Sequence, residues 1–117
     1  MQTVKVLNAT KATVLGDRIG VAGTSMTRLV GLLGRRGLDA GEGLLIMPSQ
    51  AIHTVAMRFA IDVVFLDREW RVLHLSPAVR PFRITGLHWN SRSVLELPAG
   101  VIAQTSTSIG DQLSVEE

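Results

Sequence analysis

The segment from Ile52 to Asp67 constrains the fold of this chain more than any other stretch. It is almost continuously apolar and rich in β-branched residues, which favours strands over a helix. With a period of two, one face carries His53, Val55, Met57, Phe59, Ile61, Val63 and Phe65. The opposite face carries Thr54, Arg58 and Asp62. A bend near Phe59 would shift this register, so the alternation is predicted only within each half.

Arg58 and Asp62 are the charged residues inside this apolar run. An unpaired ion in a protein interior is costly, so each of them needs a partner or a water-facing cavity. One interpretation is an ion pair or a hydrogen-bonded turn that fixes the bend of the strand. The other is a concave site in which Arg58 binds an anionic ligand through two parallel hydrogen bonds.

Shorter strands are predicted on both sides of this run, because apolar and β-branched residues recur between turn-forming residues. They are Val4–Leu7, Thr13–Leu15, Gly43–Met47, Trp70–Leu75, Ser93–Leu97 and Gln112–Val115. We expect Gly16 and Asp17 to end the second of these strands. The segment from Pro77 to Asn90 has two prolines, a glycine and little periodicity, which predicts a long loop. Loops of this length in small domains are often binding loops or mobile flaps.

One helix is predicted over Thr24–Gly34. Thr24 or Ser25 can cap its first turn, and apolar residues recur there at spacings of three and four. A short helical turn is expected within Gly100–Thr105. These elements predict a mainly β fold, a small barrel or sandwich of about seven to eight short strands with one packed α-helix. A length of 117 residues without linkers or repeats indicates one domain over residues 1–117.

Composition excludes several classes of protein. The chain has no cysteine, and therefore no disulfide, thiolate metal site or cysteine nucleophile. A net charge of +2 and few aromatic residues argue against a nucleic-acid partner. No apolar run is long enough to span a membrane, and the N-terminal residues alternate like a strand, so we expect a cytoplasmic protein without a membrane partner.

Polar residues that could carry chemistry are few. His53 and Glu96 would make a histidine–carboxylate couple that serves as general base or metal ligand. The three histidines, however, lie far apart without metal-binding spacing, so neither a metal nor a cofactor is predicted. No nucleophile elbow or phosphate loop is present, and no catalytic residue is assigned. Trp89, in the long loop beside His88, suits stacking on a sugar or another ring.

Several short motifs, and the order in which they occur, resemble those of a known family. They are Gly31 to Arg35, Gly43 to Ile46, His53-Thr54, Met57 to Phe59, Ile61 to Asp67, Val94 to Gly100 and Gly110-Asp111. Together they resemble the bacterial and archaeal domain of unknown function 192. The resemblance implies a β-rich barrel or sandwich with a helix packed across it, and it implies no enzymatic activity. Many members have tryptophan where this chain has Ala56 and proline where it has Ala60, so a pocket at that place would differ in shape.

The preferred hypothesis is a non-enzymatic domain that binds a small molecule, such as a carbohydrate or an anionic metabolite. Its site would lie between Ile52–Asp67 and Pro77–Asn90. The predicted site residues are His53, Arg58, Asp62, Trp89 and Glu96. One alternative is a hydrolase-type enzyme that uses His53 with a carboxylate. The other is a protein-interaction module. Nothing in the sequence indicates the oligomeric state.

Overall fold

A computed structural model describes residues 2–22, 37–47, 59–81, 83 and 85–117. The strands in these residues are β1 (Thr3–Asn8), β2 (Thr13–Ala22), β3 (Glu42–Ile46), β4 (Ile61–Leu66), β5 (Val72–Val79), β6 (Ser93–Pro98) and β7 (Leu113–Glu116). The helix is α2 (Val101–Gln104). The helix predicted over Thr24–Gly34 lies outside the described residues, and so do His53 and Arg58.

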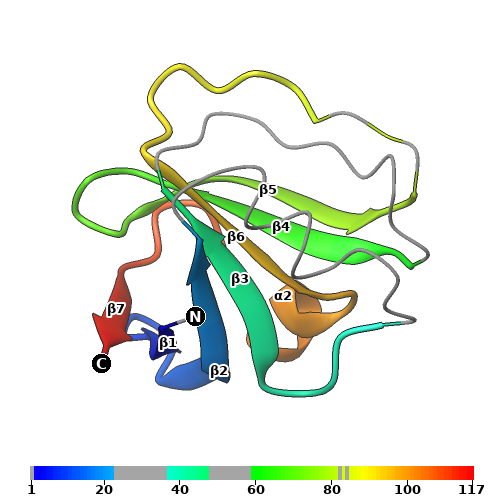
Figure 1. Ribbon diagram of the computed structural model, residues 1–117. Coiled ribbons are helices and arrows are strands. Elements are labelled where there is room, and N and C mark those ends of the chain that lie inside the picture. The colour runs from blue at the N-terminus through cyan, green and yellow to red at the C-terminus, as the bar shows by residue number, and fades with distance from the viewer. Residues whose placement is uncertain (1, 23–36, 48–58, 82, 84) are drawn as a thin grey trace.

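The seven strands form one curled sheet with the shape of a half-barrel, and α2 lies against its end (Figure 1). The strand order is β5-β4-β6-β3-β2-β1-β7. The pair β2 and β3 is parallel, and the other neighbouring pairs are antiparallel. The predicted mainly β, barrel-like fold of short strands is therefore confirmed.

The two outermost strands of the sheet meet at one end. Although β5 and β7 stand at opposite ends of the strand order, the backbone amide of Leu113 donates to the carbonyl of Trp70 at 2.9 Å. The amide of Val72 donates to the carbonyl of Asp111, also at 2.9 Å. These bonds, with the bridge between Arg71 and Gln112, pair backbone groups at the start of the two edge strands, where they would otherwise face solvent. We call this junction the seam.

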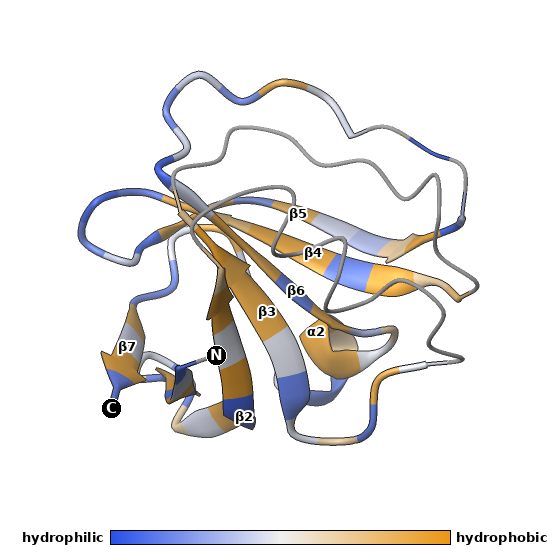
Figure 2. Cartoon of the chain, viewed as in Figure 1, coloured by the Kyte–Doolittle hydropathy of each residue, from blue (hydrophilic) through white to orange (hydrophobic). Residues whose placement is uncertain are grey.

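Strand β4 is buried at all six of its positions, so both faces of the sheet are covered there. Val64 and Leu66 belong to an interior cluster inside the half-barrel, whereas Ile61, Val63 and Phe65 belong to an outer cluster on the opposite face. This alternation confirms the predicted period of two within β4. Figure 2 shows β4 and β6 orange along most of their length, each interrupted by a blue polar block.

The predicted end of the second strand at Gly16 and Asp17 is wrong, because β2 continues to Ala22. Gly16 pairs with Val6 of the neighbouring strand. A Cβ atom at Gly16 would lie 2.5 Å from the Cδ1 atom of Ile19 and 2.9 Å from the carbonyl oxygen of Gly41. Close packing therefore accounts for this glycine, and no turn is formed.

The predicted start of the long loop at Pro77 is also too early, because β5 runs to Val79. This strand lies at an edge of the sheet, where the missing amide of a proline is tolerated. Ala78 has a φ of 50°, which indicates an irregularity in the strand. The loop consequently begins after Val79.

Candidate functional site

Asp62 is a structural acceptor of hydrogen bonds from the backbone. Its side chain is buried, with an exposed fraction of 1% for the residue. Its Oδ1 atom accepts from the amide of Ala78 at 2.8 Å. Its Oδ2 atom accepts from the amides of Gly100 at 3.1 Å and Ile102 at 2.8 Å. The carboxylate therefore links the irregular end of β5 to the first turn of α2, and such bonds offset its burial.

Glu96 lies on the other face of the sheet. In the pairing of β4 with β6, Asp62 stands opposite Leu97, and Val63 stands opposite Glu96. Leu97 belongs to the interior cluster and Val63 to the outer cluster. Glu96 has an exposed fraction of 0%, so its carboxylate is buried among the apolar residues of the outer face. The two carboxylates thus do not converge on one site.

Trp89 lies in the loop that joins β5 to β6, and 76% of its surface is exposed. The neighbouring His88 turns back onto the outer face of the sheet. Its ring stacks on His74 with 4.2 Å between centroids, and it lies 4.3 Å from the ring of Phe65. Burial, followed by the charge of His74, holds the pKa of His88 below its ordinary value of 6.5.

The predicted site is therefore only partly brought together in the described residues. Asp62 faces the interior, Glu96 faces the outer cluster, and Trp89 projects from the loop. Whether His53 and Arg58 lie near Glu96 stays a prediction, because both lie outside the described residues.

A cleft of about 490 Å³ lies at a different place, where β2 passes the end of β6 and α2. Its polar wall is formed by Asp17, Arg18 and Gln104. Its apolar wall includes Val14, Pro98 and Val101. This volume is within the range of small-molecule sites in proteins.

Arg18 fixes the rim of the cleft. Its amide donates to the carbonyl of Gly41 at 2.8 Å, and its Nη2 atom donates to the carbonyl of Ala40 at 2.5 Å. Gly41 has a φ of 88°, a conformation that favours glycine. A Cβ atom there would also overlap the Oδ1 atom of Asp17. The missing side chain at Gly41 therefore keeps room for the Asp17 carboxylate at the rim.

The opposite wall depends on Asp62. By accepting from the amides of Gly100 and Ile102, it holds the first turn of α2, which presents Gln104 to the cleft. The hydroxyl of Thr105 is engaged with the carbonyl of Val101 at 2.7 Å. Gln104 thus supplies the exposed polar side chain on this side.

The charges at the cleft are balanced. Asp17 and Arg18 are the charged residues among its described lining, and the Oδ1 atom of Asp17 lies 3.5 Å from the Nε atom of Arg18. Both side chains are more than half exposed, so this pair contributes little to stability and remains accessible to a ligand. The cleft offers carboxylate acceptors beside guanidinium and amide donors.

Sequence reasoning missed Asp17, Arg18 and Gln104. The residues that line the cleft come from β2, from the turn before β3 and from α2, which are distant in sequence. The available signal was the pair Gly16-Asp17, interpreted as a break in a strand. Within the described parts of the chain, His, Asp and Glu side chains form no group of three suited to a metal ion.

A family model described as "Uncharacterized ACR", domain of unknown function 192, matches residues 6–115. The chain belongs to this family. Membership confirms the resemblance that the ordered motifs indicated.

Relatives of this domain of unknown function 192 protein occur in archaea. A UPF0127 protein of Thermococcus sibiricus is 32% identical over 116 residues, which are 95% of this chain and 74% of that relative. A UPF0127 protein of Pyrococcus furiosus is 28% identical and covers 92% of this chain and 95% of its own length.

Two solved structures share the fold of this family member. A protein of unknown function from Novosphingobium aromaticivorans has a TM-score of 0.79 and 23% identity, over 96% of this chain and 83% of that one. A protein from Sinorhizobium meliloti, classed provisionally as a transcription regulator, has a TM-score of 0.78 and 21% identity, over 96% and 91%. At these identities the likeness concerns the fold alone. Among the described residues, no helix is long and apolar enough to cross a membrane.

Proposed function

We propose that this protein is a non-enzymatic domain that binds a small polyhydroxylated molecule of the carbohydrate class. The observation that carries the proposal is the cleft of about 490 Å³ walled by Asp17, Arg18 and Gln104. A site of this size accommodates a mono- or disaccharide.

The polar groups of the cleft suit hydroxyl groups. Each hydroxyl of a sugar both donates and accepts a hydrogen bond. The carboxylate of Asp17 accepts, while the guanidinium of Arg18 and the amide of Gln104 donate. Because Asp17 and Arg18 offset each other, a neutral ligand is favoured over an anion. Val14 and Pro98 offer an apolar surface to the carbon face of a sugar ring.

Binding is favoured over catalysis in this cleft. General acid–base catalysis requires a proton donor and acceptor arranged around the reacting atoms. The described lining has Asp17 as its titratable acid and contains no histidine. A hydrolase that uses His53 with a carboxylate would have to act elsewhere in the molecule.

Two-dimensional NMR of ¹⁵N-labelled protein tests the proposal with a panel of mono- and disaccharides, and with phosphate and citrate as anionic probes. We expect a saccharide to shift the amides of Asp17, Arg18, Gly41 and Gln104 together. Gln104→Ala should weaken that binding about tenfold, as expected when a ligand hydrogen bond is lost. Val14→Phe should abolish it by filling the cleft.

Gln2→Ala is the matched control, because Gln2 is another exposed glutamine and lies outside the cleft lining. It should bind like the unsubstituted protein. Shifts clustered around Trp89 and Glu96 would favour the site predicted from the sequence over the cleft. Shifts from phosphate or citrate alone would contradict the carbohydrate class, and an absence of clustered shifts would contradict the binding function.

A further inference from the structure

The charges of the chain are segregated. From Trp70 to Leu95 there are four arginines and neither aspartate nor glutamate, although the whole chain has 10 acidic residues and a net charge of only +2. These arginines are Arg71, Arg80, Arg83 and Arg92, and all of them are exposed. Three of the four lie in residues 80–92, the arginine-rich loop. This segment therefore contains basic residues and no acidic residue.

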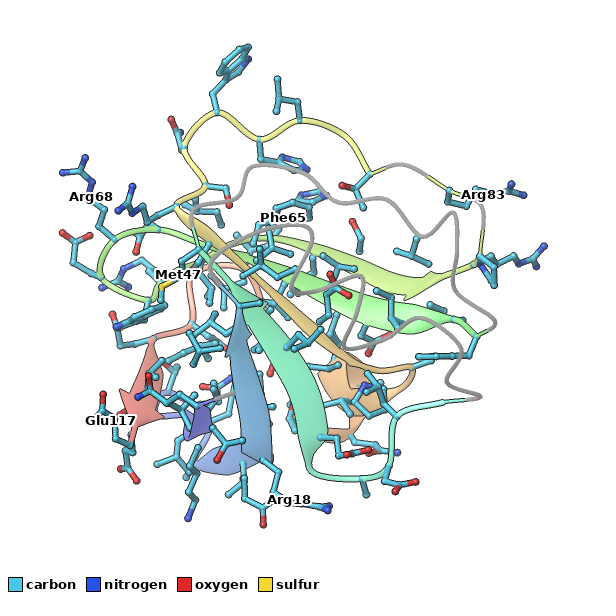
Figure 3. All side chains as sticks on the ribbon, in the orientation of Figure 1. Arg18, Met47, Phe65, Arg68, Arg83 and Glu117 are labelled. Atoms are coloured by element: carbon cyan, nitrogen blue, oxygen red, sulfur yellow. The ribbon has the colours of Figure 1, made fainter. Side chains whose placement is uncertain are left out.

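The arginine-rich loop runs along the length of β4. It starts after Val79, which pairs with Ile61 at the beginning of β4, and it ends before Ser93, which pairs with Leu66 at the end of β4. Five residue steps along a strand span roughly 17 Å. The loop thus extends its arginines over a distance that an extended peptide of about five residues covers. Figure 3 shows Arg83 pointing away from the sheet.

Contacts with β4 and within the loop hold the arginine-rich loop in place. The amide of Arg92 donates to the carbonyl of Leu66 at 2.8 Å, and the amide of Ser91 donates to the carbonyl of His88 at 2.9 Å. The imidazole of His88 packs on the ring of Phe65, and the two ring centroids lie 4.3 Å apart. Since these contacts fix its end and its middle, less ordering is needed when a partner binds.

Apolar side chains project from the same loop. Leu87 is 50% exposed and Trp89 is 76% exposed, on either side of the anchored His88. Tryptophan and arginine are the residue types that most often dominate the energy of protein interfaces. Exposed apolar residues among arginines are thus typical of a protein-binding surface.

We propose that the arginine-rich loop is a docking surface for an extended acidic segment of a partner protein. Arg83 and Arg92 bind carboxylates of that segment, and Leu87 with Trp89 contacts an apolar side chain between them. Guanidinium groups bind carboxylates with two parallel, charge-assisted hydrogen bonds. The loop lies at the opposite end of the molecule from Arg18 and the cleft (Figure 3), so this surface is independent of the carbohydrate site.

A protein segment fits this surface better than the other anionic macromolecules. Single-stranded nucleic acid binds to several exposed rings in succession, and Trp89 is the large exposed aromatic residue of the described chain. Stable attachment to a membrane surface needs a continuous apolar face, whereas Leu87 and Trp89 are two separate side chains.

Fluorescence anisotropy tests the proposal with a short labelled peptide in which glutamates flank a single leucine. We expect this peptide to bind, and the peptide with glutamine at every glutamate position to bind at least about tenfold more weakly. Binding should weaken as salt is raised, because exposed charges are screened. The double substitution Arg83→Glu with Arg92→Glu should weaken it to the same degree, and Trp89→Ala should weaken it about fivefold or more.

Lys5→Glu is the matched control, because it reverses an exposed charge on β1, away from the loop. It should leave peptide binding unchanged, as should Val14→Phe in the cleft. Equal binding of the glutamate and glutamine peptides would overturn the proposal. It would also be overturned if the double variant lost binding to anionic phosphatidylglycerol vesicles or to oligothymidine while binding the acidic peptide normally. Circular dichroism of each variant verifies the fold.

Discussion

At the scale of single residues, the carboxylate of Asp62 joins two parts of the chain that are far apart in sequence. It accepts the amide of Ala78 on one side and the amides of Gly100 and Ile102 on the other. Because α2 forms one wall of the cleft, Asp62 supports the candidate site without lining it. A hydrogen bond to a charged group contributes about 1.5–3 kcal/mol, and bonds that share one acceptor are not additive.

Asp62→Ala should therefore lower the free energy of unfolding by about 3 kcal/mol, since three backbone amides lose their acceptor. Asp62→Asn should lower it by less, because the amide oxygen replaces one of the two carboxylate oxygens. Urea denaturation followed by circular dichroism measures both changes. Asp39→Asn, at an exposed position, is the control and should change stability by less than about 0.5 kcal/mol. If Asp62→Ala left the free energy of unfolding unchanged, other groups would have to accept hydrogen bonds from these amides.

The sequence predicted that Asp62 needs compensation, and three backbone amides supply it. These bonds reach β5 and the first turn of α2, whereas the sequence suggested a turn at the bend of its own strand. Local alternation also predicted correctly which residues of β4 share a face. It could not place Glu96 relative to Asp62, because that depends on the register between β4 and β6. A shift of one residue would have put both carboxylates on the same face.

At the scale of elements, the arginine-rich loop is anchored on the outer face by the stack of His88 on His74. The pKa of His88 is held below 6.5 by burial and by the charge of His74. The unfolded chain therefore takes up a proton at this position more readily than the folded chain does. The stabilisation is fully present above about pH 6.5 and is lost as the pH falls toward the lower pKa of the folded protein.

His88→Phe should reduce this acid sensitivity, because phenylalanine keeps a ring against Phe65 and does not titrate. Thermal unfolding between pH 8 and pH 5 compares the two proteins, and hydrogen exchange reports the opening of the loop. We expect the unsubstituted protein to lose more stability on acidification than the variant. If the stability of the two proteins fell equally between pH 8 and pH 5, His88 would not contribute to the acid sensitivity.

Most strands were predictable from local patterns, namely the alternation of Thr3–Asn8 and the short, mostly apolar run of Ser93–Pro98. The sequence did not predict that β2 continues through Gly16 or that β5 continues through Pro77. In both cases the local residues favour a break, and pairing with a neighbouring strand or a position at the sheet edge decides the outcome. The cleft was missed for the same reason, since its walls meet only after the sheet has curled.

At the scale of the whole molecule, the half-barrel depends on the seam between β5 and β7. Asp111 lies directly at this seam, where its carbonyl accepts the amide of Val72. Its carboxylate accepts from the Nδ2 atom of Asn8 at 2.9 Å, the Nζ atom of Lys11 at 2.8 Å and the amide of Ser108 at 2.9 Å. One buried side chain thus connects the end of β1 to the turn that precedes β7.

The titration of Asp111 follows from these contacts. Burial raises the pKa of its carboxyl, but hydrogen bonds from Asn8, Lys11 and Ser108 and the charge of Lys11 outweigh burial, so the pKa lies below the ordinary value of 3.8. A carboxyl with a lowered pKa stabilises the fold at pH values above its ordinary pKa. That stabilisation is lost as the pH falls below 3.8 through the pKa of the folded protein.

Asp111→Asn should consequently lower the free energy of unfolding by about 2 kcal/mol at neutral pH, because the ion pair with Lys11 and one acceptor are lost. The difference from the unsubstituted protein should shrink as the pH falls from 3.8 through the lower pKa of the folded protein, below which the native carboxyl is also neutral. Urea denaturation at neutral and acidic pH measures this change, with Glu116→Gln on the exposed part of β7 as control. Because the seam joins both edges of the sheet, hydrogen exchange should speed up in β5 and β7 together. Faster exchange in β7 alone would mean that the half-barrel does not depend on this junction.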